Sequence, residues 1–336
     1  MSNQKNNLIL DIEGLSVRYT TEDGTVYALN DLDLQLGYRQ TLGLVGETGA
    51  GKTTAALAIL RLISDPPGIV ECRKLQIGGR DILSLPPEQM DEIRGKDVSM
   101  IFQDPMTALN PVFTVGEQIA ESLELHEDLS HAEAMARACE MLELVGIPGN
   151  RAKDYPHQFS GGMKQRVVIA IALACNPRLL IADEPTTALD VTIQAQVLEL
   201  MNELKRRYDT SMIMITHDLG IVAEVCDTVA VMYAGRIVEQ GTLEDVFDHT
   251  LHPYTEGLFN SLPNIRSRTE MLRPIKGLMP DPTELPPGCA FAPRCDYADE
   301  ECFRRRPTLV KVGATHSFAC LAYEREGFHI QRGSDR

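Results

Sequence analysis

The sequence predicts an α/β fold in which a parallel sheet is covered by helices on both sides. Three short, continuously apolar segments have the length and composition of buried strands, at residues 41–45, 178–183 and 211–217. Segments with helical periodicity alternate with them, for example at residues 193–207. Buried strands that alternate with helices are typical of a parallel sheet between two helical layers.

The remaining elements can be assigned in chain order. Residues 8–19 have the alternation of an edge strand, the dipeptide at residues 23 and 24 is a turn signal, and residues 25–36 resume a strand pattern. Further along, the sequence predicts a strand at 99–104, mainly helices at 113–158, a helix from Gly161 to Asn176-Pro177, and a hairpin at 229–240.

Overall composition argues against several classes of protein. The chain has 336 residues, of which 43% are hydrophobic and 24% are charged, as in ordinary globular proteins. Its net charge of −16 makes nucleic acid a poor partner. The first residues do not resemble a signal peptide, and no run of about 18 apolar residues could span a bilayer. We therefore expect a cytosolic protein that can dock on a membrane protein.

A phosphate-binding loop is predicted at GETGAGKT, residues 46–53, which fits G-x-x-x-x-G-K-[S/T] between a strand and a helix. The glycines let backbone N–H groups approach phosphates closely. Lys52 would reach the β- and γ-phosphates, and the Thr53 hydroxyl would bind Mg²⁺. The chain is therefore expected to bind a nucleoside triphosphate.

Two acidic residues end the buried strand in LLIADEP, residues 179–185. Ligands gather at the carboxyl ends of the strands of a parallel sheet. Asp183 is placed to hold Mg²⁺ through water, and Glu184 is the candidate base for the attacking water. The alternative is a strand that simply ends at a charged turn, and the nearby phosphate loop disfavours it.

Polar residues also follow two other predicted strands. His217 ends the strand SMIMITH and is a candidate sensor of the γ-phosphate, the alternative being a structural hydrogen bond. Gln103 follows SMIF and could orient water and Mg²⁺, the alternative being an exposed loop amide. Both would lie at the edge of the sheet where the phosphates are expected.

A second possible anion site lies at FSGGMKQR, residues 159–166, where a serine and two glycines open a helix. This helix start cannot easily reach a γ-phosphate that GETGAGKT already encloses. It could serve the nucleotide of a second molecule, with two chains facing head to tail around two ATPs. The alternative is that Ser160 only N-caps its helix. Spacing alone does not decide between them.

Together these motifs resemble the ATP-binding cassette (ABC) family over roughly residues 8–245. The resemblance implies a P-loop NTPase fold with a RecA-like core, an antiparallel β-subdomain and a helical subdomain at about 104–165. It implies a nucleotide-binding domain at residues 1–262. The signature reads FSGGM rather than the commoner LSGGQ, and the Phe and Met variants are familiar in one subgroup.

The resemblance also assigns roles to single residues. Tyr19 would stack on adenine, Asp190 would be the D-loop aspartate, and catalysis would rest on Glu184, His217 and Gln103. Mg²⁺ would be held through Thr53, Gln103 and Asp183. The residues implied to bind ATP within one chain, besides Tyr19, are Gly46, Glu47, Thr48, Gly49, Ala50, Gly51, Lys52, Thr53 and Thr54. Those implied to bind the ATP of the partner subunit are Ser160, Gly161 and Gly162.

Three further segments resemble the ATPases of dipeptide and oligopeptide importers, a subgroup that includes nickel-chelate uptake systems. They are FQDPMTALNP, HPYTEGLFNSLP and GCAFAPRC. The resemblance implies an ATP-hydrolysing subunit, peripheral on the cytoplasmic side of the inner membrane. Its implied partners are a second homologous ATPase, two permease subunits and an external solute-binding protein. Uptake of nickel or other small solutes, a soluble cassette ATPase, and a module that holds ATP without hydrolysis are the alternatives. The pairing of like or unlike ATPases is left open.

A separate C-terminal region is expected at residues 263–336, where a Pro-rich arm precedes four cysteines. Cys289, Cys295, Cys302 and Cys320 have the spacing C-x5-C-x6-C-x17-C, which lacks the close pair common in zinc sites. Four thiolates suit a [4Fe–4S] cluster, and the importer subgroup has a similar arrangement. The sequence favours such a cluster over Zn²⁺ or free thiols.

Overall fold

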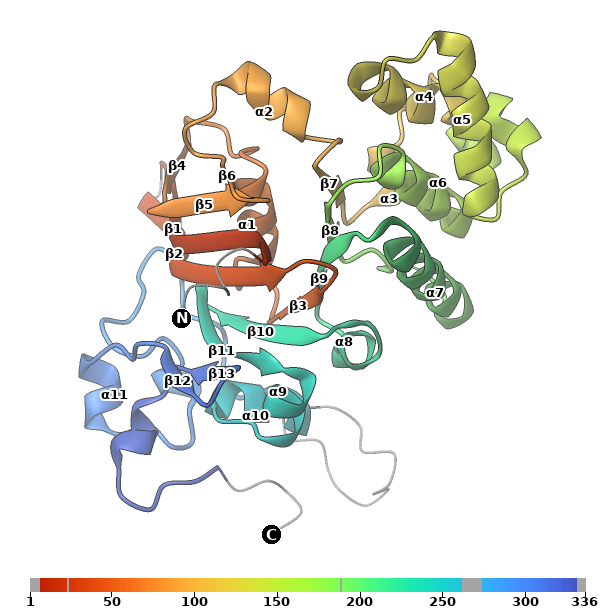
Figure 1. Cartoon of the computed structure of the whole chain (residues 1–336). Helices are drawn as coiled ribbons and strands as arrows, with labels where there is room; N and C mark the ends of the chain where they lie inside the picture. The colour runs from red at the N-terminus through yellow and green to blue at the C-terminus, as the bar shows by residue number, and fades with distance from the viewer. Residues whose placement is uncertain (1–6, 23, 188, 262–273, 331–336) are drawn as a thin grey trace. The chain divides into compact units, whose positions relative to one another are not determined.

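The computed structural model describes residues 7–22, 24–187, 189–261 and 274–330. These residues form two compact units. The first unit comprises residues 7–11, 34–41 and 75–216, and the second comprises residues 12–33, 42–74 and 217–330 (Figure 1). The domain boundary predicted between residues 262 and 263 lies outside the described residues, as does much of the Pro-rich arm.

A parallel sheet forms the core of the first unit. Strand β8, Leu179–Asp183, pairs in parallel with β7, Val98–Ile101, on one side and with β9, Ser211–Thr216, on the other. Every residue of β8 and β9 is buried, as expected for strands covered on both faces. The predicted strands and their parallel arrangement are thus confirmed. The long helix α7, Val191–Tyr208, connects β8 to β9.

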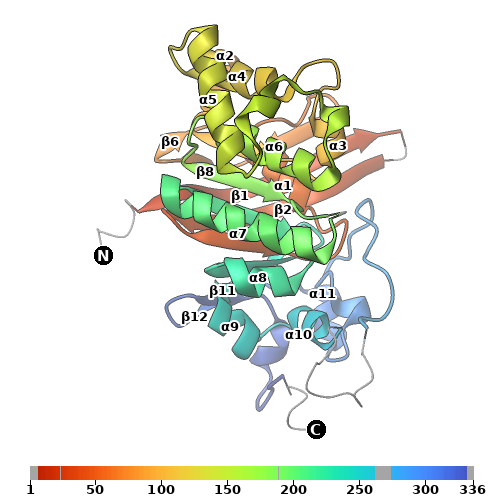
Figure 2. The same ribbon diagram turned by 90° about the vertical axis from the view of Figure 1, so that its right-hand side faces the viewer.

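Helices predicted for residues 113–158 and for the segment after Gly161 are also present, and they form one group in the first unit (Figures 1 and 2). Capping boxes at Thr114 with Glu117, and at Ser130 with Glu133, start the two amphipathic helices of the group. The group consists of α3 Pro105–Ala108, α4 Val115–His126, α5 His131–Leu144 and α6 Gly161–Leu173. Earlier in the chain, β5 Lys74–Ile77 and β6 Arg80–Asp81 belong to the sheet of β1, Leu8–Thr21, and β2, Gly24–Gly37, and α2 Pro87–Ile93 follows them.

The second unit contains a mixed sheet. Strand β3, Thr41–Val45, pairs in parallel with β10, Thr228–Tyr233, from Leu42 onward. The predicted hairpin is confirmed, because β10 pairs antiparallel with β11, Arg236–Thr242. The sheet continues through β13, His316–Phe318, to β12, Val310–Val312, so the C-terminal region adds two strands. The helices of this unit are α1 Lys52–Ile59, α8 Leu219–Val225, α9 Leu243–Asp248, α10 Pro253–Asn260 and α11 Glu300–Arg304.

The first strand, β1, Leu8–Thr21, is not the edge strand that its alternation suggested. It is a neighbour of β2, Gly24–Gly37, and its later half pairs antiparallel with β4, Gly68–Glu71. Strand β4 is short, and its last three residues are exposed. Its sequence gives little indication of a strand, because it has only four residues, GIVE, and two prolines precede it.

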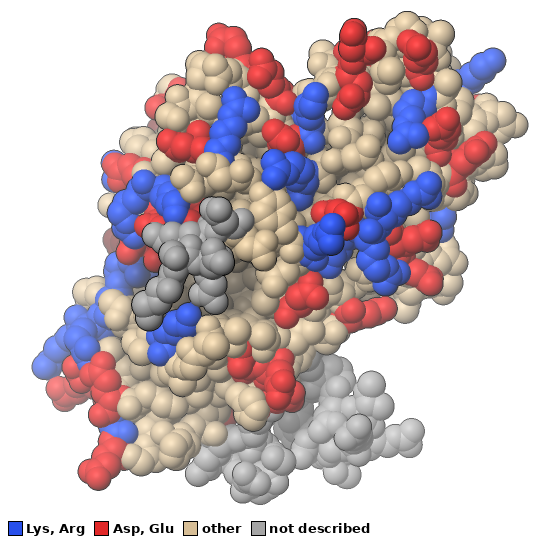
Figure 3. Space-filling view, in the orientation of Figure 1, with Lys and Arg blue, Asp and Glu red and all other residues tan. Residues whose placement is uncertain are grey.

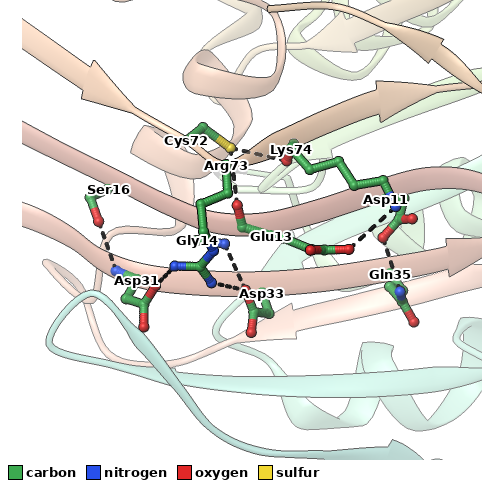
Figure 4. Close-up of polar contacts among 10 residues, drawn as sticks. All are labelled: Asp11, Glu13, Gly14, Ser16, Asp31, Asp33, Gln35, Cys72, Arg73 and Lys74. Atoms are coloured by element: carbon green, nitrogen blue, oxygen red, sulfur yellow. Dashed lines mark hydrogen bonds and ion pairs between the residues drawn. The ribbon is translucent and has the colours of Figure 1, made fainter.

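A surface network joins the chain after β4 to β1 and β2 (Figure 4). The Arg73 guanidinium contacts the carboxylates of Asp31 at 2.6 Å and Asp33 at 3.4 Å. Asp33 also accepts a hydrogen bond of 2.6 Å from the N–H of Gly14, whose φ of 66° suits glycine. These ion pairs are exposed, so each contributes at most about 1 kcal/mol to the stability of the fold.

Charged side chains of both signs are interspersed on the face shown in Figure 3. Among the described residues, none of the helices is long and apolar enough to cross a membrane.

Candidate functional site

The predicted phosphate loop follows β3 and ends at the first turn of α1. Gly51 occupies the N-cap of α1 with φ 102°, a left-handed conformation that glycine adopts without strain. A Cβ at Gly51 would lie 2.6 Å from the Ala28 carbonyl oxygen, and one at Gly46 would lie 2.2 Å from the Met232 carbonyl oxygen. Both glycines are therefore required by close backbone packing as well as by the loop's shape.

Lys52 is the first residue of α1, and its side chain folds back over the loop. Only 7% of the residue is exposed. Its Nζ donates hydrogen bonds to the carbonyl oxygens of Gly46 at 2.8 Å and of Glu47 at 3.1 Å. The ammonium group thus lies within the curve of the loop at the helix N-terminus, where the helix dipole also favours an anion.

Glu184, the candidate base, is held in position by two hydrogen-bond donors. Gln103 donates from Nε2 to Glu184 Oε2 at 3.1 Å, and Thr187 donates from Oγ1 to the same oxygen at 2.9 Å. The structure therefore brings together two residues that the sequence assigned separately to catalysis. The sequence analysis did not predict a role for Thr187, although its position three residues after Glu184 in the same loop indicates that the two side chains can be close.

The backbone at Glu184 is also unusual. Its φ is 45°, which a non-glycine residue adopts only at a cost of about 1–3 kcal/mol. The N–H of Glu184 donates to the Ile215 carbonyl oxygen at 2.9 Å, which fixes the turn at the end of β8 against β9. Asp183, the residue before it, is only 2% exposed. Such a conformation turns the Glu184 side chain away from the strand direction and is typical of functional sites.

The helix start at FSGG lies on the surface of the first unit. Ser160 N-caps α6, and its side chain accepts a hydrogen bond from the N–H of Met163 at 3.4 Å, so the predicted cap is confirmed. Gly162 allows close packing, since a Cβ there would lie 2.7 Å from the Ile193 side chain of α7. Gly161 is different. It is exposed, and no described atom outside its own helix lies within 4 Å of the position that a Cβ would take.

The remaining predicted site residues have simpler settings. Asp190 N-caps α7 by accepting a hydrogen bond from the N–H of Ile193 at 3.0 Å. His217 follows β9 and is exposed, and Tyr19 is half-buried on β1. Tyr19, His217 and the phosphate loop belong to the second unit, whereas Gln103, Asp183, Glu184, the FSGG helix start and Asp190 belong to the first.

The four C-terminal cysteines gather around one small cavity, which all four side chains line. Cys302 is buried and packs with Ala292 and Leu321. Its carbonyl oxygen accepts a hydrogen bond of 2.7 Å from the N–H of Cys289. Burial raises the pKa of Cys295 to about 12 and that of Cys320 to about 11. Both thiols are therefore protonated at neutral pH in this arrangement.

These cysteines are not arranged around a single ion. Among the described residues, no group of three or more His, Cys, Asp and Glu side chains could hold a metal ion. The zinc alternative requires ligand atoms about 2.0–2.3 Å from one point, so the structure does not support it. It does not establish the iron–sulfur cluster either, which stays a prediction. His316, four residues before Cys320 in the sequence, has its Nε2 2.9 Å from the buried Glu239 carboxylate.

Comparison with known proteins agrees with the motifs. A family model described as ABC transporter matches residues 29–187, and one described as oligopeptide/dipeptide transporter, C-terminal region, matches residues 238–302. The chain is 47% identical to the oligopeptide transport ATP-binding protein AppD of Bacillus subtilis, over 95% of this chain and 98% of that protein. It is 51% identical to OppD of the same organism, over 92% of this chain and 87% of that protein.

Solved structures show the same fold. A dimeric structure of the ATP-binding cassette MJ0796 in a post-hydrolysis state, bound to ADP and Pi, matches with a TM-score of 0.62 and 25% identity. The match covers 70% of this chain and 98% of the MJ0796 chain. CbiO1 from Clostridium perfringens, part of an ABC transporter complex, matches with a TM-score of 0.60 and 27% identity, over 72% of this chain and 91% of that chain. The predicted P-loop NTPase fold is thus confirmed, and the chain belongs to the ABC transporter family, in the group that carries the oligopeptide/dipeptide transporter C-terminal region.

Proposed function

We propose that this chain is the ATP-hydrolysing subunit of an importer that takes up dipeptides or oligopeptides through partner permease subunits. The observation that carries the proposal is the similarity along nearly the whole chain to proteins named as oligopeptide transport ATP-binding proteins, at 47–51% identity. The family model that matches the C-terminal region is described as oligopeptide/dipeptide transporter, which agrees with a peptide as the transported solute.

ATP binds along the phosphate loop. Backbone N–H groups of residues 46–54 surround the phosphates, Lys52 neutralises the β- and γ-phosphates, and Tyr19 stacks on adenine. Mg²⁺ would be held, directly or through water, by the Thr53 hydroxyl, the Gln103 amide oxygen and the Asp183 carboxylate, since oxygen ligands are the kind that it prefers. When bound, it neutralises charge that develops on the phosphates.

Hydrolysis depends on Glu184. Its carboxylate accepts a proton from the attacking water, while Gln103 and Thr187 hold the carboxylate in one orientation. His217 contacts the γ-phosphate and stabilises its charge in the transition state. The proton taken by Glu184 can then leave with the products, which returns the carboxylate for another cycle.

The ATP site is completed by a second subunit. Ser160, Gly161 and Gly162 bind the triphosphate held on the facing chain's phosphate loop, and Asp190 lies at the same interface. The exposed Gly161, with open space around it, supports this role, since a phosphate can approach its backbone closely. Two ATPs therefore join two ATPase subunits, and hydrolysis releases them.

The subunit acts at the cytoplasmic face of the membrane without crossing it. Closure of the ATPase pair moves the helical subdomain at about 104–165, and permease segments resting against it change the access of the transport path. The second ATPase is a homologous and different chain, and an external solute-binding protein delivers the peptide.

The test of this function is transport in a reconstituted system. The chain is co-expressed with its partner permease subunits and second ATPase, and the complex is placed in liposomes with ATP on the side of the membrane that carries the ATPase subunits. Labelled di- and oligopeptides, with the binding protein, should be taken up in an ATP-dependent manner, and a nickel chelate should not. A chain that never co-purifies with membrane subunits would contradict the proposal.

We further propose that the four-cysteine lobe holds a [4Fe–4S] cluster. The supporting observation is that Cys289, Cys295, Cys302 and Cys320 line one cavity. Since their raised pKa values keep the thiols protonated, loading would exchange those protons for metal. A cluster would also stabilise a lobe too small to bury a large core of its own.

Anaerobic purification tests the cluster. We expect roughly four irons and four sulfides per chain, with brown colour, because a [4Fe–4S] cluster uses four cysteine thiolates. Cys302→Ser should lose most of the iron, whereas Cys139→Ser, outside the lobe, should keep it. A colourless, iron-free protein from iron-replete cells would contradict the proposal.

A further inference from the structure

The N–H, the carbonyl oxygen and the carboxylate of Glu47, the second residue of the phosphate loop, all form hydrogen bonds. Its N–H donates to the Oη of Tyr254 at 2.8 Å, and its carbonyl oxygen accepts from Lys52 Nζ at 3.1 Å and from the N–H of Ala50 at 3.1 Å. Its carboxylate pairs with Arg294, which lies 247 residues further along the chain. The loop's conformation therefore depends on groups outside the loop.

The contact between Glu47 and Arg294 is a two-point ion pair. Arg294 donates from Nη1 to Glu47 Oε2 at 2.6 Å and from Nη2 to Oε1 at 3.0 Å. The Arg294 side chain is only 6% exposed, and that of Glu47 is 30% exposed. Parallel, charge-assisted bonds of this kind fix both partners in one geometry. Water screens such a pair far less than it screens an exposed one.

Arg294 is itself held rigidly. Its Nε donates to the Lys276 carbonyl oxygen at 2.9 Å, and its Nη1 also donates to the Oη of Tyr233 at 3.3 Å. It ends the short 3-10 turn Ala292–Arg294, which follows the buried Phe291. The guanidinium is therefore fixed by contacts that do not involve the phosphate loop.

A buried aromatic cluster supports both partners of the ion pair. The Phe291 ring packs against Tyr233 and Tyr254, with ring centroids 5.3 and 5.4 Å apart. The hydroxyl oxygen of the fully buried Tyr254 accepts a hydrogen bond from the N–H of Glu47. The hydroxyl oxygen of Tyr233 accepts one from Arg294 Nη1. Cys295 directly follows Arg294 in the sequence, so the ion pair connects the phosphate loop to the four-cysteine lobe.

We propose that Arg294 is a positioning residue for the phosphate loop: its ion pair with Glu47 holds the loop in the conformation that binds ATP, so the C-terminal lobe sets the ATP affinity of the cassette. The inference rests on the proposed role of residues 46–54 in ATP binding. Without the ion pair, the loop populates other conformations. The affinity for ATP then falls in proportion to the fraction of molecules whose loop is still in the ATP-binding conformation.

The experiment measures the dissociation constant for ATP on the full-length chain by equilibrium dialysis. Arg294→Gln should raise it roughly tenfold, if the competent loop falls to about a tenth of the molecules. Arg294→Lys, which keeps the charge without the fork, should give a smaller rise. Arg304→Gln is the matched control, because Arg304 lies in the same lobe and its ion pair with Glu300 is exposed to solvent. It should bind ATP like the unmodified chain.

A double-mutant cycle, with ATP affinity as the readout, tests whether Arg294 acts on ATP binding through Glu47. If Arg294 acts through Glu47, Arg294→Gln should not weaken ATP binding further in a chain that already carries Glu47→Gln. Additive effects, or unchanged binding by Arg294→Gln, would overturn the inference. Should Arg294→Gln fail to fold, unchanged binding by Arg294→Lys would overturn it equally.

A further variant keeps the two proposals distinguishable. Lys52→Ala should lose ATP binding if residues 46–54 form the ATP site. Unchanged binding by Lys52→Ala would contradict the proposed function itself. Loss of binding by Lys52→Ala, with unchanged binding by the Arg294 variants, would contradict only the role of Arg294.

Discussion

Glu184→Gln should reduce ATP turnover by a factor of about 10²–10⁴, the usual contribution of a general base. The amide keeps the size of the side chain and can still face Gln103 and Thr187, but it cannot accept the proton of the attacking water. ATP binding should remain, so ATPase pairs should accumulate with ATP between them. Phosphate release in single-turnover assays and gel filtration with ATP measure the two effects.

The matched control is Glu199→Gln, an exposed carboxylate on α7. It removes the same charge from the same unit, and its turnover should equal that of the unmodified chain. Phosphate release by Glu184→Gln at an unimpaired rate would show that another group activates the water. The positive φ at Glu184 and its two side-chain donors would then need a different explanation.

Gly161→Asp should abolish turnover, with a loss of at least about 10²-fold, the cost typical of removing one well-placed phosphate contact and placing charge against it. The carboxylate would face the triphosphate held by the facing subunit. Since a Cβ at Gly161 meets open space, the fold of the chain itself should be preserved. Turnover and thermal unfolding, measured on the same preparation, check both statements.

Gly161→Ala refines this prediction. Alanine is favoured over glycine by about 1 kcal/mol in a helix interior. Gly161 is the first residue of α6, so the gain should be smaller, and the fold should stay about as stable. Turnover should nevertheless fall, because the added methyl group keeps the phosphate away from the backbone N–H groups. Full turnover by both Gly161 variants would show that this helix start does not contact ATP.

Much of the fold follows from local pattern. The buried strands β3, β8 and β9 are continuously apolar, and the phosphate loop has a fixed spacing, so both could be predicted from short segments. Strand β4 could not, because its pairing with β1 rather than its own composition makes it a strand. The same holds for β12 and β13, which are three residues each.

The candidate site divides in the same way. The types of Glu184 and Gln103 indicated their chemistry, but the hydrogen bond between them joins residues 81 positions apart and arises only from the pairing of β7 with β8. The role of Arg294 could not be predicted, because its partner Glu47 lies 247 positions away. An arginine next to a cysteine does not by itself indicate any function. The four cysteines stood out because they cluster near the C-terminus, but their spacing did not reveal their geometry.

The central claim is that one chain holds only part of each ATP site and that a second chain completes it. The most direct measurement is turnover of a dilute chain, shown by sedimentation to be unassociated, compared with turnover after addition of the second ATPase. Turnover should be negligible for the single chain and should rise with the concentration of the partner until all chains are paired. Full turnover by the unassociated chain would contradict the claim.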